Sequence, residues 1–159
     1  MPDIYSVLQT LSIPFTRYNH PAVFTVEEST EICKNIPGVK TKNLFLRNRA
    51  GNKHWLLVIA AAKRADLKRL SGLLGEPKLS FASPENLMKY LGVTPGSVTL
   101  LGLINDTAHE VNVIMDEDVM KQNEIQFHPL TNTATLVIPR QGVEKFITWC
   151  GNKLFVQSL

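Results

Sequence analysis

The sequence predicts an α+β (mixed α/β) domain in which a mixed, largely antiparallel sheet is surrounded by helices. Apolar residues recur at helical spacing in some segments and form short, strand-like runs in others. These segments alternate without a regular repeat, and several strands are joined by connections too short for a helical crossover. The chain has 159 residues, 44% of them hydrophobic and 19% charged, which is typical of one globular domain. We therefore assign residues 1–159 to a single domain.

Helices, a strand and a hairpin are expected in the N-terminal part of the chain. Asp3 is a helix cap, and apolar residues recur after it at helical spacing until Pro14 ends the helix. Thr25 and Glu28 have the spacing of a capping box, which begins a second helix. Two apolar runs flank the turn-forming segment 48–52 and predict a β-hairpin. The expected ranges are a helix after Asp3, a strand at 15–19, a helix at 26–35 that carries Cys33, and hairpin strands at 43–47 and 55–61.

The rest of the chain is predicted to contain further helices and a larger number of short strands. Leucines at helical spacing from Leu67 are stopped by Gly75. Ser83 followed by Pro84 is a cap with proline at the first helical position, and Gly92 closes that helix. Short apolar runs predict the strands. The expected ranges are helices at 67–74, 84–91 and 141–149, and strands at 79–82, 99–104, 111–115, 125–128, 133–138 and 154–156.

Charge is unevenly distributed along a chain whose net charge is only +3. Ten basic residues lie between Lys34 and Arg69, against the single acid Asp66. From residue 105 to 124 the balance reverses, with six acidic residues against Lys121. Such a chain would orient a polyanion toward its basic half. An equally good interpretation is that these charges lie on solvated faces of helices and hairpins.

Several classes of protein are disfavoured by what the sequence lacks. No stretch approaches the roughly 18 apolar residues of a membrane helix, and the start lacks the pattern of a secretory signal, so we expect a cytoplasmic protein. Cys33 and Cys150 lack paired spacing and are expected to be reduced, buried thiols. Nucleotide-binding glycine loops and a Gly-x-Ser-x-Gly motif are absent, and the histidines lack metal-site spacing. We expect neither a metal nor a cofactor.

Three polar clusters lie where strands end or loops turn, and each has a structural and a functional interpretation. The first, at 40–43, places lysines before an apolar strand, where an ammonium group is either solvated or directed at a phosphate or carbonyl. The second, at 92–99, is either a plain connection or a glycine loop whose backbone N–H groups approach a ligand carbonyl. The third, at 127–132, contains His128, and a lone histidine there is more often structural than catalytic.

Taken in this order, the clusters resemble the YbaK and prolyl-tRNA editing family over nearly the whole chain. The resemblance begins at Tyr18-Asn19-His20-Pro21 with Thr25-Val26-Glu27-Glu28 and reaches the C-terminal helix. Two segments, Lys42-Asn43-Leu44-Phe45-Leu46 and Phe127-His128-Pro129-Leu130 with Asn132, resemble the alanine-specific PrdX or ProX branch, whereas the YbaK branch tends to have Lys-Thr-Leu. The glycine loop of the family commonly reads Gly-x-x-x-Pro. Here Gly96-Ser97-Val98-Thr99-Leu100 lacks the closing proline.

This resemblance implies a YbaK-like fold and a deacylase that hydrolyses mischarged alanyl-tRNA(Pro) without a cofactor, with a small pocket that excludes proline. The implied partners are aminoacylated tRNA(Pro) and, as a further candidate, prolyl-tRNA synthetase. The alternatives are a deacylase for cysteinyl-tRNA(Pro) or another small amino acid, and a non-catalytic module that binds tRNA or the synthetase. The implied site consists of Lys42 on the terminal phosphate or ribose, backbone N–H groups of Gly96, Ser97 and Val98 at the oxyanion, His128 positioning the aminoacyl group or the adenosine, and Asn43, Thr131 and Asn132 in contact with the substrate.

Overall fold

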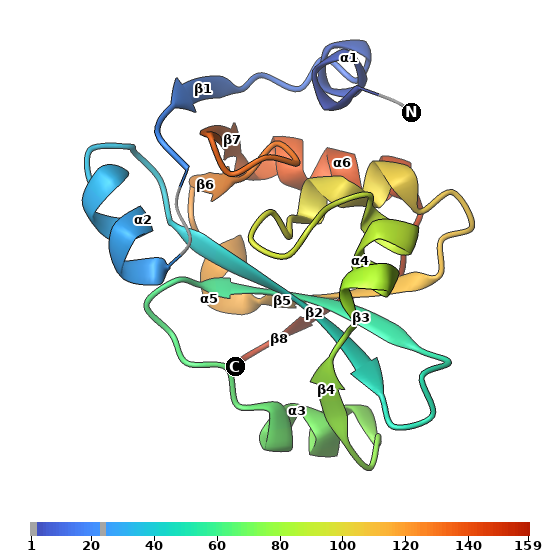
Figure 1. The fold of residues 1–159 in the computed structure, drawn as a ribbon. Helices are drawn as coiled ribbons and strands as arrows, with labels where there is room; N and C mark the ends of the chain where they lie inside the picture. The colour runs from blue at the N-terminus through green and yellow to red at the C-terminus, as the bar shows by residue number, and fades with distance from the viewer. Residues whose placement is uncertain (1–2, 23–24) are drawn as a thin grey trace.

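The computed structural model describes residues 3–22 and 25–159, and Figure 1 shows the arrangement of their helices and strands. The elements are α1 (Ile4–Thr10), β1 (Thr16–Asn19), α2 (Val26–Ile32), β2 (Thr41–Asn48), β3 (His54–Ala60), α3 (Leu67–Leu74), β4 (Leu79–Phe81), α4 (Pro84–Leu91), the 3-10 helix η1 (Leu100–Asn105), β5 (Val111–Asp116), α5 (Glu117–Met120), β6 (Glu124–Phe127), β7 (Ala134–Pro139), α6 (Arg140–Cys150) and β8 (Leu154–Gln157).

The strands form two sheets where one was expected. The larger sheet has the order β4-β2-β3-β5-β8, and the smaller has the order β1-β7-β6. Antiparallel pairs join β2 to β3 and β4, and also join all strands of the smaller sheet, whereas β3, β5 and β8 run parallel. A parallel bridge between Val39 and Ile125 connects the two sheets. The α+β class and the largely antiparallel pairing are confirmed.

The larger sheet separates two apolar cores. Side chains alternate between the faces of a strand, so Phe45 of β2 enters one core and Leu46 enters the other. The first core is filled from α1, α4, η1, α6 and the smaller sheet, which Figure 1 shows on one side of the larger sheet. The second core is covered by α3 on the opposite side, where Leu70 is buried. Strand β2 also carries Lys42 and Asn43 of the lysine cluster predicted from sequence.

Most helix boundaries follow the expected local signals. The Asp3 carboxylate accepts a hydrogen bond from the backbone N–H of Tyr5, and the Ser83 hydroxyl accepts one from that of Asn86. Gly75 and Gly92 end their helices in the left-handed conformation that glycine adopts without a Cβ clash. Thr25 caps α2 as expected, because the Glu28 backbone N–H donates to the Thr25 hydroxyl at 3.1 Å and that hydroxyl donates to the Glu28 carboxylate at 3.3 Å.

Three expectations about secondary structure were wrong. The segment expected as a strand at 99–104 is the 3-10 helix η1, and α5 was not expected at all. A short buried apolar run suits either a strand or a buried helix, and here the Thr99 hydroxyl caps η1 by accepting the Leu101 N–H. Helix α2 ends at Ile32, so Cys33 lies in the following turn.

Both cysteines are free thiols in the core. Burial raises the pKa of Cys150 to about 12, which leaves little of the reactive thiolate at neutral pH. The expected burial of both cysteines is confirmed.

Candidate active site

A cavity of about 420 Å³ lies beside the N-terminal half of β2 and gathers residues that are far apart in the sequence. Its volume falls in the range of small-molecule sites. Of the eight residues predicted to form the site, five line this cavity, and three do not. The five that line it are Lys42, Asn43, Gly96, Val98 and His128.

The cavity exists because the edge of β2 is covered along only part of its length. The short strand β4 pairs with residues 46–48 of β2, and the last contact on this side is the Ala82 N–H donating to the Phe45 carbonyl at 2.9 Å. Beyond Phe45 no further strand pairs with this edge of β2 in the described chain. Side chains from both faces of β2, among them Lys42 and Asn43, therefore reach the same cavity.

Lys42 brings a positive charge to the cavity without a partner. Its ammonium makes no hydrogen bond or ion pair with any residue in the ranges 3–22 and 25–159, and the side chain is only partly exposed. Lys40 also lines the cavity, and burial lowers its pKa, which shows that this wall is partly shielded from water. An ammonium group in such a place suits a phosphate or carboxylate ligand.

Asn43 holds the glycine loop against β2. Its Oδ1 accepts the backbone N–H of Leu100 at 2.7 Å, and its Nδ2 donates to the hydroxyl of Thr41 at 3.2 Å. Thr41 in turn donates to the backbone carbonyl of Gln126 at 2.7 Å, which links the network to β6. The side-chain amide of Asn43 thus serves the protein itself, although the residue also lines the cavity. We read Asn43 as a positioning residue.

The glycine loop is a tight turn from Thr94 to Ser97. The Ser97 N–H donates to the Thr94 carbonyl at 3.1 Å, and Gly96 has a φ of 97°. Proline at the second position and a left-handed glycine at the third are the signature of a type II β-turn. The N–H of Ser97 is therefore used inside the turn. Those of Gly96 and Val98 donate to no residue of the described chain, and both residues line the cavity.

His128 presents a hydrogen-bond acceptor to the cavity. Its Nδ1 lies 3.2 Å from the carbonyl oxygen of Ala134, and a carbonyl only accepts, so Nδ1 carries the proton and Nε2 has the lone pair. Burial lowers the pKa of His128 below its ordinary value of 6.5, and charge from His20 and Lys40 lowers it further, against the opposing effect of the Ala134 hydrogen bond. The ring is therefore neutral at pH 7.

The other three predicted residues lie outside the cavity. Ser97 is buried, and its backbone is used in the turn. Thr131 is held by its neighbour, since its hydroxyl lies 3.1 Å from that of Thr133. Asn132 is also engaged in an interaction and does not line the cavity.

Sequence reasoning missed the wall that faces Lys42. This wall is apolar and comes from the segment that joins β4 to α4, with Phe81, Ala82, Pro84 and Leu87. The alternation of Leu79, Ser80 and Phe81 predicts that Phe81 is buried like Leu79, whereas its exposed fraction is 62%. No signal in the sequence indicates this exposure, because it depends on where β4 ends relative to β2.

Metal sites and membrane-spanning helices were also sought in the described part of the chain. Within residues 3–22 and 25–159, no group of three or more His, Cys, Asp or Glu side chains is placed to hold a metal ion. In the same part of the chain, no helix is both long enough and apolar enough to cross a membrane.

Comparison with known proteins gives consistent matches. Residues 20–146 match the model of the aminoacyl-tRNA editing domain family. The chain is 37% identical over 150 residues to the prolyl-tRNA editing protein ProX of Acetoanaerobium sticklandii, which covers 94% of this chain and 91% of that protein. It is 34% identical over 147 residues to the prolyl-tRNA synthetase associated domain-containing protein 1 of Danio rerio, which covers 91% of this chain and 79% of that protein.

The fold is also found among solved structures. A crystal structure of a candidate trans-editing enzyme for prolyl tRNA synthetase superimposes with a TM-score of 0.71 at 20% identity, covering 100% of this chain and 98% of that one. At this level of identity the match concerns the fold alone. The YbaK-like architecture expected from the sequence is confirmed.

Proposed function

The chain belongs to the aminoacyl-tRNA editing domain family and is therefore an aminoacyl-tRNA deacylase, and on that premise we propose that it acts in trans on tRNA(Pro) mischarged with alanine. The observation that carries the proposal is one cavity lined by Lys42, the backbone of Gly96 and Val98, and the neutral ring of His128. Within the described part of the chain, neither the Lys42 ammonium nor the N–H groups of Gly96 and Val98 have a partner. The lysine can bind a phosphate, the N–H groups can bind an oxyanion, and the histidine can accept a hydrogen bond from a donor.

Support for the tRNA and for the amino acid comes from different sources. The relative from Acetoanaerobium sticklandii is named as a prolyl-tRNA editing protein, which supports tRNA(Pro). Alanine is supported by Asn43 after Lys42 and by Phe127-His128-Pro129, the two segments that resemble the alanine-specific branch. The proposed partner is thus alanyl-tRNA(Pro), met in the cytoplasm, with prolyl-tRNA synthetase as a second partner that delivers it.

The reaction needs little chemistry from the protein because an aminoacyl ester is already activated. Water attacks the ester carbonyl, the bond between that carbon and the ribose oxygen breaks, and the water proton passes to the leaving ribose oxygen. In the tetrahedral intermediate the carbonyl oxygen becomes an oxyanion. We place it at the N–H groups of Gly96 and Val98, two residues that line the cavity and whose N–H groups have no partner in the described chain.

Lys42 and His128 hold the two ends of the reacting group. Lys42 binds the phosphate or ribose of the terminal nucleotide, where its point charge needs no fixed geometry. His128 accepts a hydrogen bond from the α-ammonium group of the alanyl moiety through Nε2. The lowered pKa of His128 matters here, because a protonated ring would repel that ammonium group. Together the two side chains hold the ester at the turn.

Selectivity then depends on the apolar lining close to the turn. The alanyl methyl group lies against Val98 and Leu87, both of which line the cavity. Proline is excluded there because its ring is larger, and steric exclusion of a larger group is stronger than the roughly 1–3 kcal/mol gained per methylene of apolar contact. The cavity in this way acts as a second sieve after aminoacylation.

A panel of aminoacylated tRNAs tests the proposal. Purified protein is mixed with tRNA(Pro) charged with alanine, cysteine, serine or proline, and amino acid release is followed against the spontaneous rate. We expect fast release of alanine and none of proline. Faster release of cysteine would instead assign the chain to cysteinyl-tRNA(Pro). Tight, salt-dependent binding without any release would make it a non-catalytic tRNA-binding module.

A further inference from the structure

Phe81 is an aromatic side chain exposed at the mouth of the cavity. Its exposed fraction of 62% is the largest among the exposed large hydrophobic side chains in the described part of the chain. The others in that group, such as Trp149 and Phe155, lie elsewhere, and Phe81 alone of them lines the cavity. A large apolar ring at the rim of a binding cavity has a surface that a ligand can cover.

The fold explains why no other element among residues 3–22 and 25–159 buries this ring. Phe81 is the last residue of β4 and pairs with Leu46, on the face of the sheet that α3 covers. Helix α3 reaches Leu79, which is buried in the second core, but the chain turns into α4 directly after Phe81. The ring therefore stands beside the uncovered edge of β2, between the cavity and solvent.

The two walls of the cavity differ in chemistry in a way that describes a ligand. One wall carries the cationic side chains of Lys40 and Lys42 together with His128. The other is apolar and consists of Phe81 with Ala82, Pro84 and Leu87. A ligand that fills both sides has an anionic or polar part and a flat apolar face. The terminal nucleoside of a tRNA has both, because a planar base is linked through ribose to a phosphate.

We propose that Phe81 is the stacking platform on which the terminal adenine of the acceptor end rests, while Lys42 binds the adjoining phosphate or ribose. This inference rests on the proposed function, since it places the nucleoside of the same aminoacyl end. Unpaired bases stack on exposed aromatic side chains in many proteins that bind single-stranded nucleic acid. The platform fixes the nucleoside and so sets the ester at the Gly96 turn.

Variants at Phe81 separate stacking from other roles of the residue. Phe81→Ala removes the ring, and Phe81→Trp keeps an aromatic face. Phe155→Ala is the matched control, because Phe155 is also an exposed aromatic residue, 40% exposed on β8, but does not line the cavity. Since Phe81 is largely exposed, its removal should leave the melting temperature close to that of the wild type.

The first readout is steady-state deacylation of alanyl-tRNA(Pro). Phe81→Ala should raise KM by about 5- to 150-fold, the range for loss of one stacked base, and should leave kcat within a few-fold of the wild type. Phe81→Trp and Phe155→Ala should keep the wild-type KM. Wild-type turnover combined with an unchanged KM for Phe81→Ala would overturn the inference and leave the proposed function intact.

The second readout does not depend on catalysis. Adenosine carrying alanine on a 3′-amide, which cannot be hydrolysed as an ester, is titrated into each variant by calorimetry. Weaker binding by Phe81→Ala, with unchanged binding by the other variants, supports stacking of the adenine on Phe81. This holds even if the wild type fails to release alanine, a result that would contradict only the proposed substrate. No binding to the wild type, or equal binding by Phe81→Ala and Phe155→Ala, overturns the inference.

Discussion

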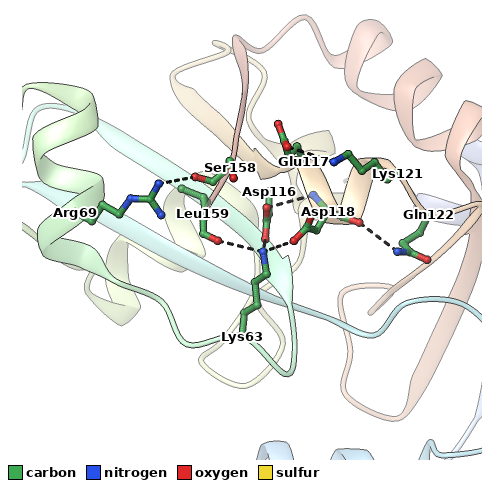
Figure 2. Close-up of polar contacts among 9 residues, drawn as sticks. All are labelled: Lys63, Arg69, Asp116, Glu117, Asp118, Lys121, Gln122, Ser158 and Leu159. Carbon is green, nitrogen blue, oxygen red and sulfur yellow. Dashed lines mark hydrogen bonds and ion pairs between the residues drawn. The ribbon is translucent and has the colours of Figure 1, made fainter.

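Two lysines from the basic segment of the chain, Lys42 and Lys63, have opposite surroundings. The ammonium of Lys63 donates to the carboxylates of Asp116 at 2.6 Å and Asp118 at 2.5 Å and to the carbonyl of Leu159 at 3.1 Å, as Figure 2 shows. Lys42 has no such partner within residues 3–22 and 25–159 and lines the cavity. One lysine is bound to the protein, and the other is available to a ligand.

Part of the uneven charge of this sequence is neutralised within the fold. The basic segment and the acidic segment meet directly at Lys63, so part of the sequence dipole is satisfied inside the fold. Hydrogen bonds to Asp116 and Asp118 raise the pKa of Lys63, and the same contact lowers the pKa of Asp118. Lys42, in contrast, has no counterion among the residues that the structure describes. Positive charge indicates function here only where the structure leaves it unpaired.

Replacing Lys42 is expected to have the largest effect on activity. Lys42→Ala should lower kcat/KM for alanyl-tRNA(Pro) on the order of 100-fold, because without the contact from Lys42 the ester is no longer held in place at the turn. The melting temperature should not fall, since Lys42 makes no ion pair or hydrogen bond with residues 3–22 and 25–159 that the substitution would remove. Full activity in Lys42→Ala, measured beside the wild type in single-turnover assays, would remove Lys42 from the site.

Replacing Gly96 should disturb the turn without crowding it. A Cβ at Gly96 would meet no atom within 4 Å, so the penalty of Gly96→Ala comes from its φ of 97°, a strain of about 1–3 kcal/mol. Because the turn then rotates its free N–H groups, we expect kcat/KM to fall by roughly 10- to 100-fold. Gly72→Ala is the control, as Gly72 also has open space around it but lies in α3. Equal activity of both variants would argue against oxyanion binding by the turn.

Replacing Lys63 should reverse the pattern seen at Lys42. Lys63→Met leaves the fully buried carboxylate of Asp116 without its cation, so the melting temperature should fall by several degrees while kcat/KM stays near the wild-type value. Lys121→Met removes an exposed pair with Glu117 and should change neither quantity. A stable Lys63→Met with reduced deacylation would contradict the assignment of the two lysines.

The pH dependence of stability follows from the same ion pairs. The pKa of Asp118 is lowered from 3.8, so its contribution is present above that value and is lost as the pH falls through the lower, folded pKa. The pKa of Lys63 is raised from 10.5, so its contribution is complete below 10.5 and is lost as the pH rises through the higher, folded pKa. Thermal unfolding of Lys63→Met should be less sensitive to pH at both extremes than that of the wild type.

The smallest expected effect is a change in the acidic limb of the activity profile. The pKa of His128 lies below 6.5, so kcat/KM should be constant near pH 7 and should fall only when the pH drops below 6.5. His128→Gln keeps an acceptor that does not titrate, and it should lose this acidic limb at a cost of a few-fold in rate. The measurement is kcat/KM against pH, corrected for spontaneous ester hydrolysis. If His128→Gln showed the same fall in kcat/KM at low pH as the wild type, the role of His128 would be contradicted.

Much of the fold could be predicted because its signals are local. The caps at Asp3 and Ser83 determine where α1 and α4 begin, and the turn at residues 48–52 determines where β2 ends and β3 begins. The 3-10 helix η1 could not be predicted, because its apolar run is compatible with a strand as well as a helix. The choice depends on the Thr99 cap and on the close packing of Gly102 against Leu91. A Cβ at position 102 would lie only 3.0 Å from Leu91. Division of the strands into two sheets depends likewise on long-range pairing.

The candidate site was predictable in its residue types and less so in their roles. Lys42, Gly96 and His128 were found from the sequence, and the structure places all three at one cavity. That the Ser97 N–H is used inside the turn follows only from backbone geometry. The exposure of Phe81 depends on the length of β4, which no pattern in the sequence specifies. Contacts across the fold, and not composition, decide which polar groups remain free.

A crystal structure of the protein with the 3′-amide of alanine and adenosine would show directly where the aminoacyl end binds. We expect the analogue to lie in the cavity, with its carbonyl oxygen at the N–H groups of Gly96 and Val98 and with Lys42 directed at its ribose. The Lys63 cluster should be unchanged. An analogue bound elsewhere, or one in the cavity that touches neither Lys42 nor the turn, would contradict it.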